Sequence, residues 1–197
     1  MLTTLQTLKI RLAIAQYDAA DDTLLTNFIL LVSARFENDC NRKFGYAQNV
    51  VDEFQADERE LRVSRYPIDE SQPIAFMRLA KASEGWQSLS NPEYVVRRGC
   101  VISLVSALGG WQEQIRVTYS GGYLLPDQSP DSNVQAPALP DDLGQSCVEQ
   151  CAYLYQNKER LGLVSVAAEG GRVQHFAKLD LLPSVASVLE KYERWMP

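Results

Sequence analysis

Residues 114–126 read QIRVTYSGGYLLP, and residues 139–162 read LPDDLGQSCVEQCAYLYQNKERLG. The first segment alternates apolar and polar residues and ends in a Gly-Gly pair, a pattern that predicts a strand at 114–119 followed by a tight turn. The second segment predicts a helix at 140–161. A spacer rich in proline separates them and predicts an extended loop. This stretch therefore contains the change from a strand-forming to a helix-forming pattern.

The helix expected at 140–161 has start and stop signals at both of its ends. Pro140 suits the first turn, and Asp141 and Asp142 place negative charge where the helix dipole favours it. Gly162 is a typical stop residue. Its apolar stripe consists of Leu143, Cys147, Cys151, Leu154 and Tyr155.

Two helices are expected upstream of this stretch. Leucines at spacings of three and four residues predict a short helix over 2–16. A second helix is expected from the acidic residues near Asp21 to about Lys43. Asn41, Arg42 and Lys43 would place positive charge in its last turn, and Gly45 would stop it.

The residues between 50 and 119 change to a period of two, which predicts short strands separated by turns. The expected strands cover 50–54, 60–66, 74–79, 94–97, 100–104 and 114–119. The first two are expected to pair with each other around a turn at 56–59. Together these strands predict a small antiparallel sheet or partial barrel.

Downstream of Gly162, residues 163–176 predict a β-hairpin with its turn at 169–171. Residues 182–184 then introduce a last helix, whose stripe is Val185, Val188, Leu189, Tyr192 and Trp195. The expected fold class is α+β. Its helical core comprises the N-terminal helix pair, the central helix and the C-terminal helix, with the sheet inserted. The expected organisation is one domain, with N-terminal helices in 1–48, a β-rich insertion in 49–124, a loop in 125–139 and the rest of the core in 140–197.

Composition narrows the possible functions of the 197-residue chain. Its 19 basic and 25 acidic residues give a net charge of −6. This charge argues against a protein that binds nucleic acid over its whole surface. The N-terminus does not predict a signal peptide, and no apolar run is long enough to predict a membrane span. Cys147 and Cys151 stack one helical turn apart, which favours small buried hydrophobic residues over a disulfide or a metal site.

No sequence motif of a nucleotide-binding, hydrolase or zinc site occurs, so no catalytic, cofactor or metal residue is expected. The single histidine, His175, has no evident catalytic partner in sequence. The alternative is a hydrolase that uses sheet carboxylates as an acid/base pair. These are Asp52, Glu53, Asp57, Glu58, Glu60, Asp69 and Glu70. Their alternation with apolar residues is also what the solvent face of a sheet produces.

The order of segments resembles the phage head–tail connector (adaptor) family of tailed phages, prophages and gene-transfer agents, in its larger members with a β-rich insertion. The resemblance rests on DDTLL at 21–25, YVV at 94–96, VTYSGGY at 117–123, LPDDL at 139–143, YLYQNKER at 153–160 and YERW at 192–195. It covers nearly the whole chain. Its motifs are patterns of fold rather than of chemistry.

This resemblance implies a structural role in the neck of a virion, assembled in the bacterial host cytoplasm. Subunits would form a homo-oligomeric ring, typically twelvefold, beneath the portal protein, and would present a surface to a stopper or tail-terminator protein. Genomic DNA would pass through the channel without sequence-specific binding. The expected partner interface comprises the hairpin and the last helix, at Val164, Val166, Arg172, Val173, His175, Phe176, Val188, Tyr192 and Trp195. A tail-terminator or stopper role is the alternative within the neck.

Overall fold

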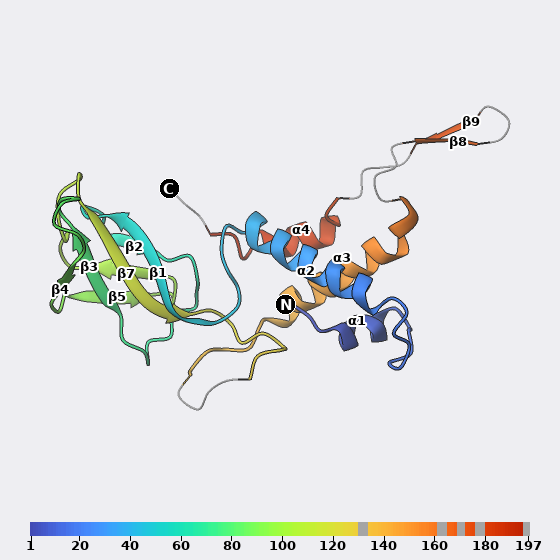
Figure 1. Ribbon diagram of the computed structural model, residues 1–197, viewed down its shortest axis with the longest axis horizontal. Helices are drawn as coiled ribbons and strands as arrows, with labels where there is room; N and C mark the ends of the chain where they lie inside the picture. Colours follow the sequence, from blue (N-terminus) through green and yellow to red (C-terminus); the bar gives the residue numbers. More distant parts are fainter. Residues whose placement is uncertain (130–133, 161–164, 169–171, 176–179, 195–197) are drawn as a thin grey trace. The chain divides into compact units, whose positions relative to one another are not determined.

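The computed structural model describes residues 1–129, 134–160, 165–168, 172–175 and 180–194 (Figure 1). The chain divides into two compact units. The helical unit comprises Met1–Cys40 and Pro140–Glu193, and the β unit comprises Asn41–Leu139 with Arg194. The described part of the chain contains no helix long and apolar enough to cross a membrane.

The helical unit is built on two longer helices, α2 (Asp22–Asp39) and α3 (Asp141–Gln156), which pack against each other. Two short helices, α1 (Leu5–Arg11) and α4 (Pro183–Leu189), pack on α3, and α1 also contacts α2. A 3-10 turn at Lys158–Arg160 follows α3, and β8 (Ser165–Ala168) pairs antiparallel with β9 (Arg172–His175). The buried stripe that joins the long helices consists of Leu25, Ile29, Val32 and Phe36 of α2 with Leu143, Cys147 and Cys151 of α3.

The helix ends follow local signals, with one difference from expectation. The Thr4 side chain caps α1 by accepting from the Thr7 backbone N–H at 3.1 Å. Asp141 and Asp142 occupy the first turn of α3, as predicted. The prediction that Gly45 stops α2 is wrong. The helix ends at Asp39, and Asn41 takes a left-handed φ of 49°, a conformation that asparagine tolerates well.

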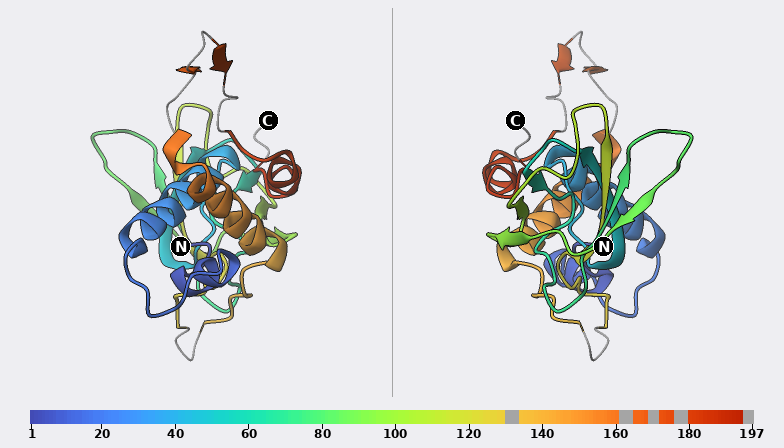
Figure 2. Two further views of the ribbon diagram at one scale, coloured as in Figure 1. Left: turned by 90° about the vertical axis from the view of Figure 1, so that its right-hand side faces the viewer. Right: turned by 90° about the vertical axis from the view of Figure 1, so that its left-hand side faces the viewer.

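The β unit contains two antiparallel sheets (Figures 1 and 2). The four-stranded sheet has the order β1-β7-β3-β4, and the three-stranded sheet has the order β2-β6-β5. The strand bounds are β1 (Ala47–Gln55), β2 (Glu60–Arg62), β3 (Ala75–Leu79), β4 (Gln87–Leu89), β5 (Tyr94–Arg97), β6 (Val101–Leu104) and β7 (Gln114–Gly121).

The two sheets of the β unit share one buried core. Alternate residues of β7, namely Ile115, Val117 and Tyr119, are 0–1% exposed. Together with Phe76 of β3 they are the residues that the four-stranded sheet contributes to this core. The three-stranded sheet contributes Leu61, Ile102 and Leu104 to the same cluster. The β unit therefore has a hydrophobic core of its own.

The Gly-Gly pair at the end of β7 has two separate structural reasons. Gly122 has a φ of 114°, which the expected turn required. At Gly121, an added Cβ would lie 2.7 Å from the Pro67 carbonyl oxygen and 2.9 Å from that of Arg65. Gly121 thus permits a close backbone approach, a role that the turn prediction did not include.

The predicted fold class is wrong in its description of a helical core that carries one inserted sheet. Helices α1 and α4 have only 7 residues each, so the N-terminal pair does not form a large helical core. The strands build two sheets over a core of their own. Alternation of apolar and polar residues indicates where strands form, but it does not indicate how the strands divide between sheets.

Two details of the strand prediction also differ. The strands at 50–54 and 60–66 do not pair, because β1 pairs with β7 while β2 pairs with β6. The strand β4 was not expected, since its residues Gln87, Ser88 and Leu89 carry little strand propensity and its pairing with β3 defines it.

Arg42 is also not where it was expected. It was predicted in the last turn of the second helix, but α2 ends at Asp39 and Arg42 is 4% exposed within the β unit. Its guanidinium lies 3.2 Å from the centre of the Tyr66 ring, with Phe44 and Tyr123 also within 5.5 Å, and it donates to the Tyr66 carbonyl oxygen. Burial lowers the pKa of Arg42, and the aromatic rings compensate part of the lost hydration. This contact anchors the first residues of the β unit.

Candidate functional site

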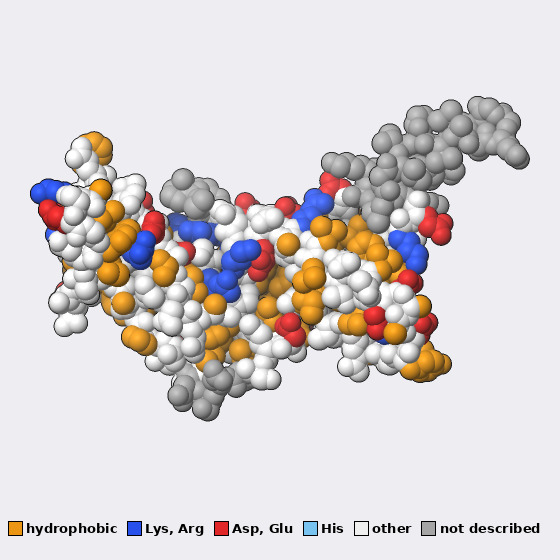
Figure 3. Space-filling model, in the orientation of Figure 1, with side chains coloured by type: hydrophobic (Ala, Val, Ile, Leu, Met, Phe, Trp, Pro, Cys, Tyr) orange, Lys and Arg blue, Asp and Glu red, His pale blue; other side chains and the backbone are white. Residues whose placement is uncertain are grey.

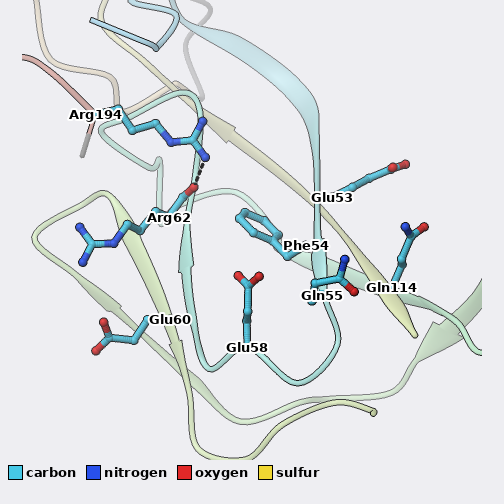
Figure 4. A pocket seen from close by; sticks show the side chains of 8 residues that line it. All are labelled: Glu53, Phe54, Gln55, Glu58, Glu60, Arg62, Gln114 and Arg194. Carbon is cyan, nitrogen blue, oxygen red and sulfur yellow. Dashed lines mark hydrogen bonds between the residues drawn. The ribbon is translucent and has the colours of Figure 1, made fainter. Parts of the chain in front are cut away.

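A polar pocket of about 430 Å³ lies at one end of the β unit (Figure 4). It is lined by Glu53, Phe54, Gln55, Glu58, Glu60, Arg62, Gln114 and Arg194. The pocket brings together three of the carboxylates that the sequence offered as acid/base candidates. The geometry of this pocket therefore bears on the alternative that the protein is a hydrolase with an acid/base pair of carboxylates.

Strand pairing positions the residues of this pocket. Glu53, Phe54 and Gln55 end β1, where Gln55 lies opposite Gln114 of β7. Glu58 lies in the loop to β2, and Figure 4 shows its side chain pointing toward Phe54. The guanidinium of Arg194 donates to the carbonyl oxygen of Arg62, which closes the pocket on that side (Figure 4).

Two of the three carboxylates at the pocket are engaged by arginines. Glu53 accepts from Arg116 at 2.6 and 3.1 Å, and the same guanidinium lies 4.1 Å from the centre of the Trp86 ring. A carboxylate oxygen of Glu60 lies 3.6 Å from the guanidinium of Arg97, on β5 of the three-stranded sheet. Glu58 has no ion pair among the described residues.

The arrangement suits a surface of mixed charge. The Glu53 and Glu60 side chains are 50% and 56% exposed. The Glu53–Arg116 pair joins the adjacent strands β1 and β7, whereas the Glu60–Arg97 pair spans β6, from β2 to β5. Such pairs are what the solvent face of an antiparallel sheet contains. The pocket can accept a cationic or polar group of a ligand beside Glu58.

The other candidate carboxylates lie elsewhere and do structural work. Asp52 accepts from the backbone N–H of Ser64 at 2.6 Å, from the Ser64 hydroxyl at 2.7 Å and from the Tyr119 hydroxyl at 2.8 Å. Burial, together with the charge of Asp52, raises the pKa of Tyr119. Asp57 and Glu70 are exposed.

Asp69 is 2% exposed and organises a second buried network. It accepts from the Tyr46 hydroxyl at 3.0 Å, from the hydroxyl and N–H of Ser71 at 2.5 and 3.1 Å, and from the N–H of Gln135 at 3.3 Å. Burial alone would raise the pKa of Asp69, but these donors outweigh it and lower the pKa below 3.8. Asp69 thereby ties the proline-rich spacer to the sheet.

The cysteines have the environment that was expected of small hydrophobic residues. Cys40, Cys147 and Cys151 are buried and Cys100 is half-buried, and all four are free thiols. The contact with Cys147, together with burial, raises the pKa of Cys151. Within the described residues, no group of three or more His, Cys, Asp or Glu side chains could hold a metal ion.

The residues expected at a partner interface are only partly described. Val164, Phe176 and Trp195 lie outside the described residues. Val166 lies in β8, and Arg172, Val173 and His175 lie in β9. Val188 is half-buried on α4, and the Tyr192 hydroxyl donates to Asp142 at 2.5 Å, which links the C-terminal segment to the start of α3. The interface itself stays a prediction.

Several large apolar side chains are exposed to solvent. In the β unit, Trp111 is 72% exposed and Val105 is 63% exposed, both in the loop between β6 and β7. In the helical unit, Tyr17 is 93% exposed and Leu31 is 59% exposed. On the face shown in Figure 3, basic and acidic side chains are interspersed rather than gathered by sign. The sequence signal for Trp111 was its position directly after Gly109-Gly110.

The comparisons with known proteins found similarity of fold only. No protein-family model and no curated protein sequence matches this chain. A chain in a solved structure of the neck of an empty GTA particle, computed with C6 symmetry, superposes with a TM-score of 0.57 at 12% identity, covering 98% of this chain and 90% of that one. A chain in the virion of a native gene transfer agent (GTA) particle gives a TM-score of 0.53 at 11% identity, with the same coverage.

Proposed function

We propose that this chain is a structural head–tail adaptor, a ring-forming protein in the neck of a phage-like particle. The observation that carries the proposal is the likeness in fold to a chain of a GTA neck, which extends over 98% of this chain. A likeness of this extent includes both the helical and the β unit. It agrees with the family that the order of sequence segments resembles.

The charge of the chain supports a role beside passing DNA. A net charge of −6 disfavours adhesion to phosphates, and the face shown in Figure 3 has basic and acidic side chains interspersed. The hairpin β8–β9 has two outer edges to which a neighbouring subunit could add a strand. In this proposal the protein has no catalytic activity, and the carboxylates of the pocket stabilise the sheets.

Subunit number and partners belong to the proposal. Rings of six or of twelve subunits both satisfy sixfold symmetry, and we propose twelve. The portal protein would bind one side of the ring, and a stopper or tail-terminator protein would bind the other.

The test is a reconstitution with the portal protein of the same particle. Purified full-length chain and portal rings are mixed at micromolar concentration and imaged by electron microscopy. We expect an added ring on one end of the portal. Portals that remain bare would contradict the adaptor role, and binding to purified tail tubes instead would favour the stopper or tail-terminator role.

A further inference from the structure

The loop between β6 and β7 exposes a tryptophan at one end of the β unit, and Figure 1 shows the loop extending beyond the strands. Trp111 is 72% exposed, whereas Trp86 is half-buried against Arg116. Burial of so large an exposed apolar side chain by a partner would be favourable. Tryptophan is also among the residues most enriched at the energetic centres of protein interfaces.

The loop that carries Trp111 is attached to neighbouring strands by hydrogen bonds. The N–H groups of Leu108 and Gly109 both donate to the Ala56 carbonyl oxygen at 3.0 Å, and the Ala56 N–H donates to Glu113 at 2.9 Å. Arg78 donates to the Leu108 carbonyl oxygen at 3.2 Å. These contacts attach the loop to the end of β1 on both sides of Trp111.

Close packing at Gly109 also restrains the loop. A Cβ at Gly109 would lie 2.1 Å from the Glu113 carboxylate and 2.9 Å from the Ala56 Cβ. The Glu113 carboxylate in turn accepts from the Gly110 N–H at 3.2 Å. An exposed aromatic side chain on a fixed loop loses little conformational entropy when it binds a partner.

Unpaired carboxylates lie beside this loop. Asp57 and Glu58 follow Ala56, the residue to which the loop is attached, and both are exposed. Neither forms an ion pair within the described residues. One exposed arginine, Arg59, follows them, so residues 57–59 carry a net charge of −1, which disfavours phosphates.

We infer that Trp111, together with Asp57 and Glu58, forms a docking tip for a protein partner that presents an apolar pocket bordered by lysine or arginine. Trp111 would fill the pocket, and the two carboxylates would pair with the basic rim. This inference rests on the proposed function, because it assigns one of the neck contacts to the β unit. The docking tip is separate from the partner interface that the sequence predicts at the hairpin and the last helix.

Binding of the full-length chain to portal rings and to the adjacent stopper or tail-terminator protein tests the docking tip. We expect Trp111→Ala to weaken binding to one of these two proteins at least about tenfold, since central interface aromatics commonly contribute that much. Tyr17→Ala is the matched control, because it removes an aromatic side chain that is 93% exposed in the other unit. Circular dichroism and the melting temperature should not change in either variant.

A charge variant provides the second measurement. Asp57→Asn with Glu58→Gln should weaken the same interaction several-fold at low salt, and this difference should vanish near 1 M salt, where the screening length is about 3 Å. If wild type binds and the Trp111→Ala protein binds equally well, the docking tip is wrong and the proposed function stands. If wild type binds neither the portal nor the stopper or tail-terminator protein, both the proposed function and the docking tip are wrong.

Discussion

At the scale of single residues, buried polar groups account for features that the pattern of apolar residues does not reveal. Asp69 is surrounded by four donor groups from three residues, and Arg42 is enclosed by three aromatic rings. A charged residue in an alternating pattern is expected to face solvent. Both of these residues instead face inward, where local partners (Ser71, Phe44) and partners distant in sequence (Tyr46, Gln135, Tyr66, Tyr123) surround them.

Replacing Asp69 with Asn should lower the free energy of unfolding by about 2–3 kcal/mol at pH 7, because the amide cannot accept from all of the donors around it. The pKa of Asp69 is lowered in the folded state, so the carboxylate stabilises the protein above pH 3.8. This contribution is lost as the pH falls through the folded-state pKa. Urea unfolding of both proteins from pH 7 to pH 3 should therefore show the difference shrinking below about pH 4.

Glu70→Gln is the control for that experiment, since Glu70 is the exposed neighbour of Asp69. It should leave the unfolding midpoint unchanged at pH 7. A difference between wild type and Asp69→Asn that stays constant down to pH 3 would contradict the assigned role of the carboxylate.

At the scale of elements, a buried lysine links α1 to α2. Lys9 is 3% exposed, and its ammonium donates to the carbonyl oxygens of Asp18 at 2.7 Å and of Gln16 at 3.3 Å. It also lies 2.5 Å from the carboxylate of Asp22, in the first turn of α2. The segment between the two helices is therefore closed around one side chain. Helix α1 ends at Arg11, and Ala13 takes a left-handed φ of 55° before the segment that contacts Lys9.

Replacing Lys9 with Met should lower the free energy of unfolding by about 2–3 kcal/mol, because it leaves two carbonyl oxygens and a carboxylate without their donor. Methionine keeps most of the side-chain volume, so a cavity does not explain the loss. Chemical denaturation of both proteins measures the change.

The comparison for Lys9 is Lys81→Met. Lys81 also forms an ion pair, with Glu84 at 3.1 Å, but its side chain is 74% exposed. We expect no measurable change there, since exposed pairs contribute little. Equal effects in the two variants would show that Lys9 does not hold the helices together.

At the scale of the whole molecule, the two units have separate buried cores. The helical unit is closed by α2 and α3, and the β unit is closed by two sheets. Local opening in proteins follows such cooperative groups of contacts. A core substitution should consequently act mainly on the unit that contains it.

Leu143, fully buried in α3, offers a test of this independence. Leu143→Ala should destabilise the helical unit by about 2–5 kcal/mol, the usual loss for removing a buried leucine side chain. In hydrogen–deuterium exchange we expect faster exchange in peptides from α2 and α3 and unchanged exchange in β1 and β7. Val117→Ala, in the core of the β unit, should give the opposite distribution. Uniform acceleration along the chain in both variants would mean that the units unfold together.

Local signals in the sequence were sufficient to locate most elements. The strand at 114–119 and the helix at 140–161 both exist, as β7 (Gln114–Gly121) and α3 (Asp141–Gln156). The second helix and the C-terminal hairpin were predicted in the same way, and β8 and β9 confirm that hairpin. Periodicity, caps and turn residues act over a few positions, so they can be read from one segment at a time.

The pocket could be predicted only as a set of candidate carboxylates. Glu53, Glu58 and Glu60 line one pocket, but Figure 4 shows their carboxylates pointing in different directions, and Asp52 and Asp69 lie in separate hydrogen-bond networks. All of these residues fall in alternating segments and are indistinguishable by pattern. Arg194 reaches the same pocket from the other end of the chain, which no local signal indicates.

Residue order by itself determined where this chain forms helices and strands, because those preferences arise from neighbouring side chains and from the backbone between them. Only the tertiary structure decided that β1 pairs with β7 rather than with β2, that the strands divide into two sheets, and that Arg42 is buried. Several strands carry equivalent alternating patterns, so each could pair with many others. Close packing at Gly121 and the shared core around Tyr119 select one arrangement, and they do so through contacts between residues more than fifty positions apart.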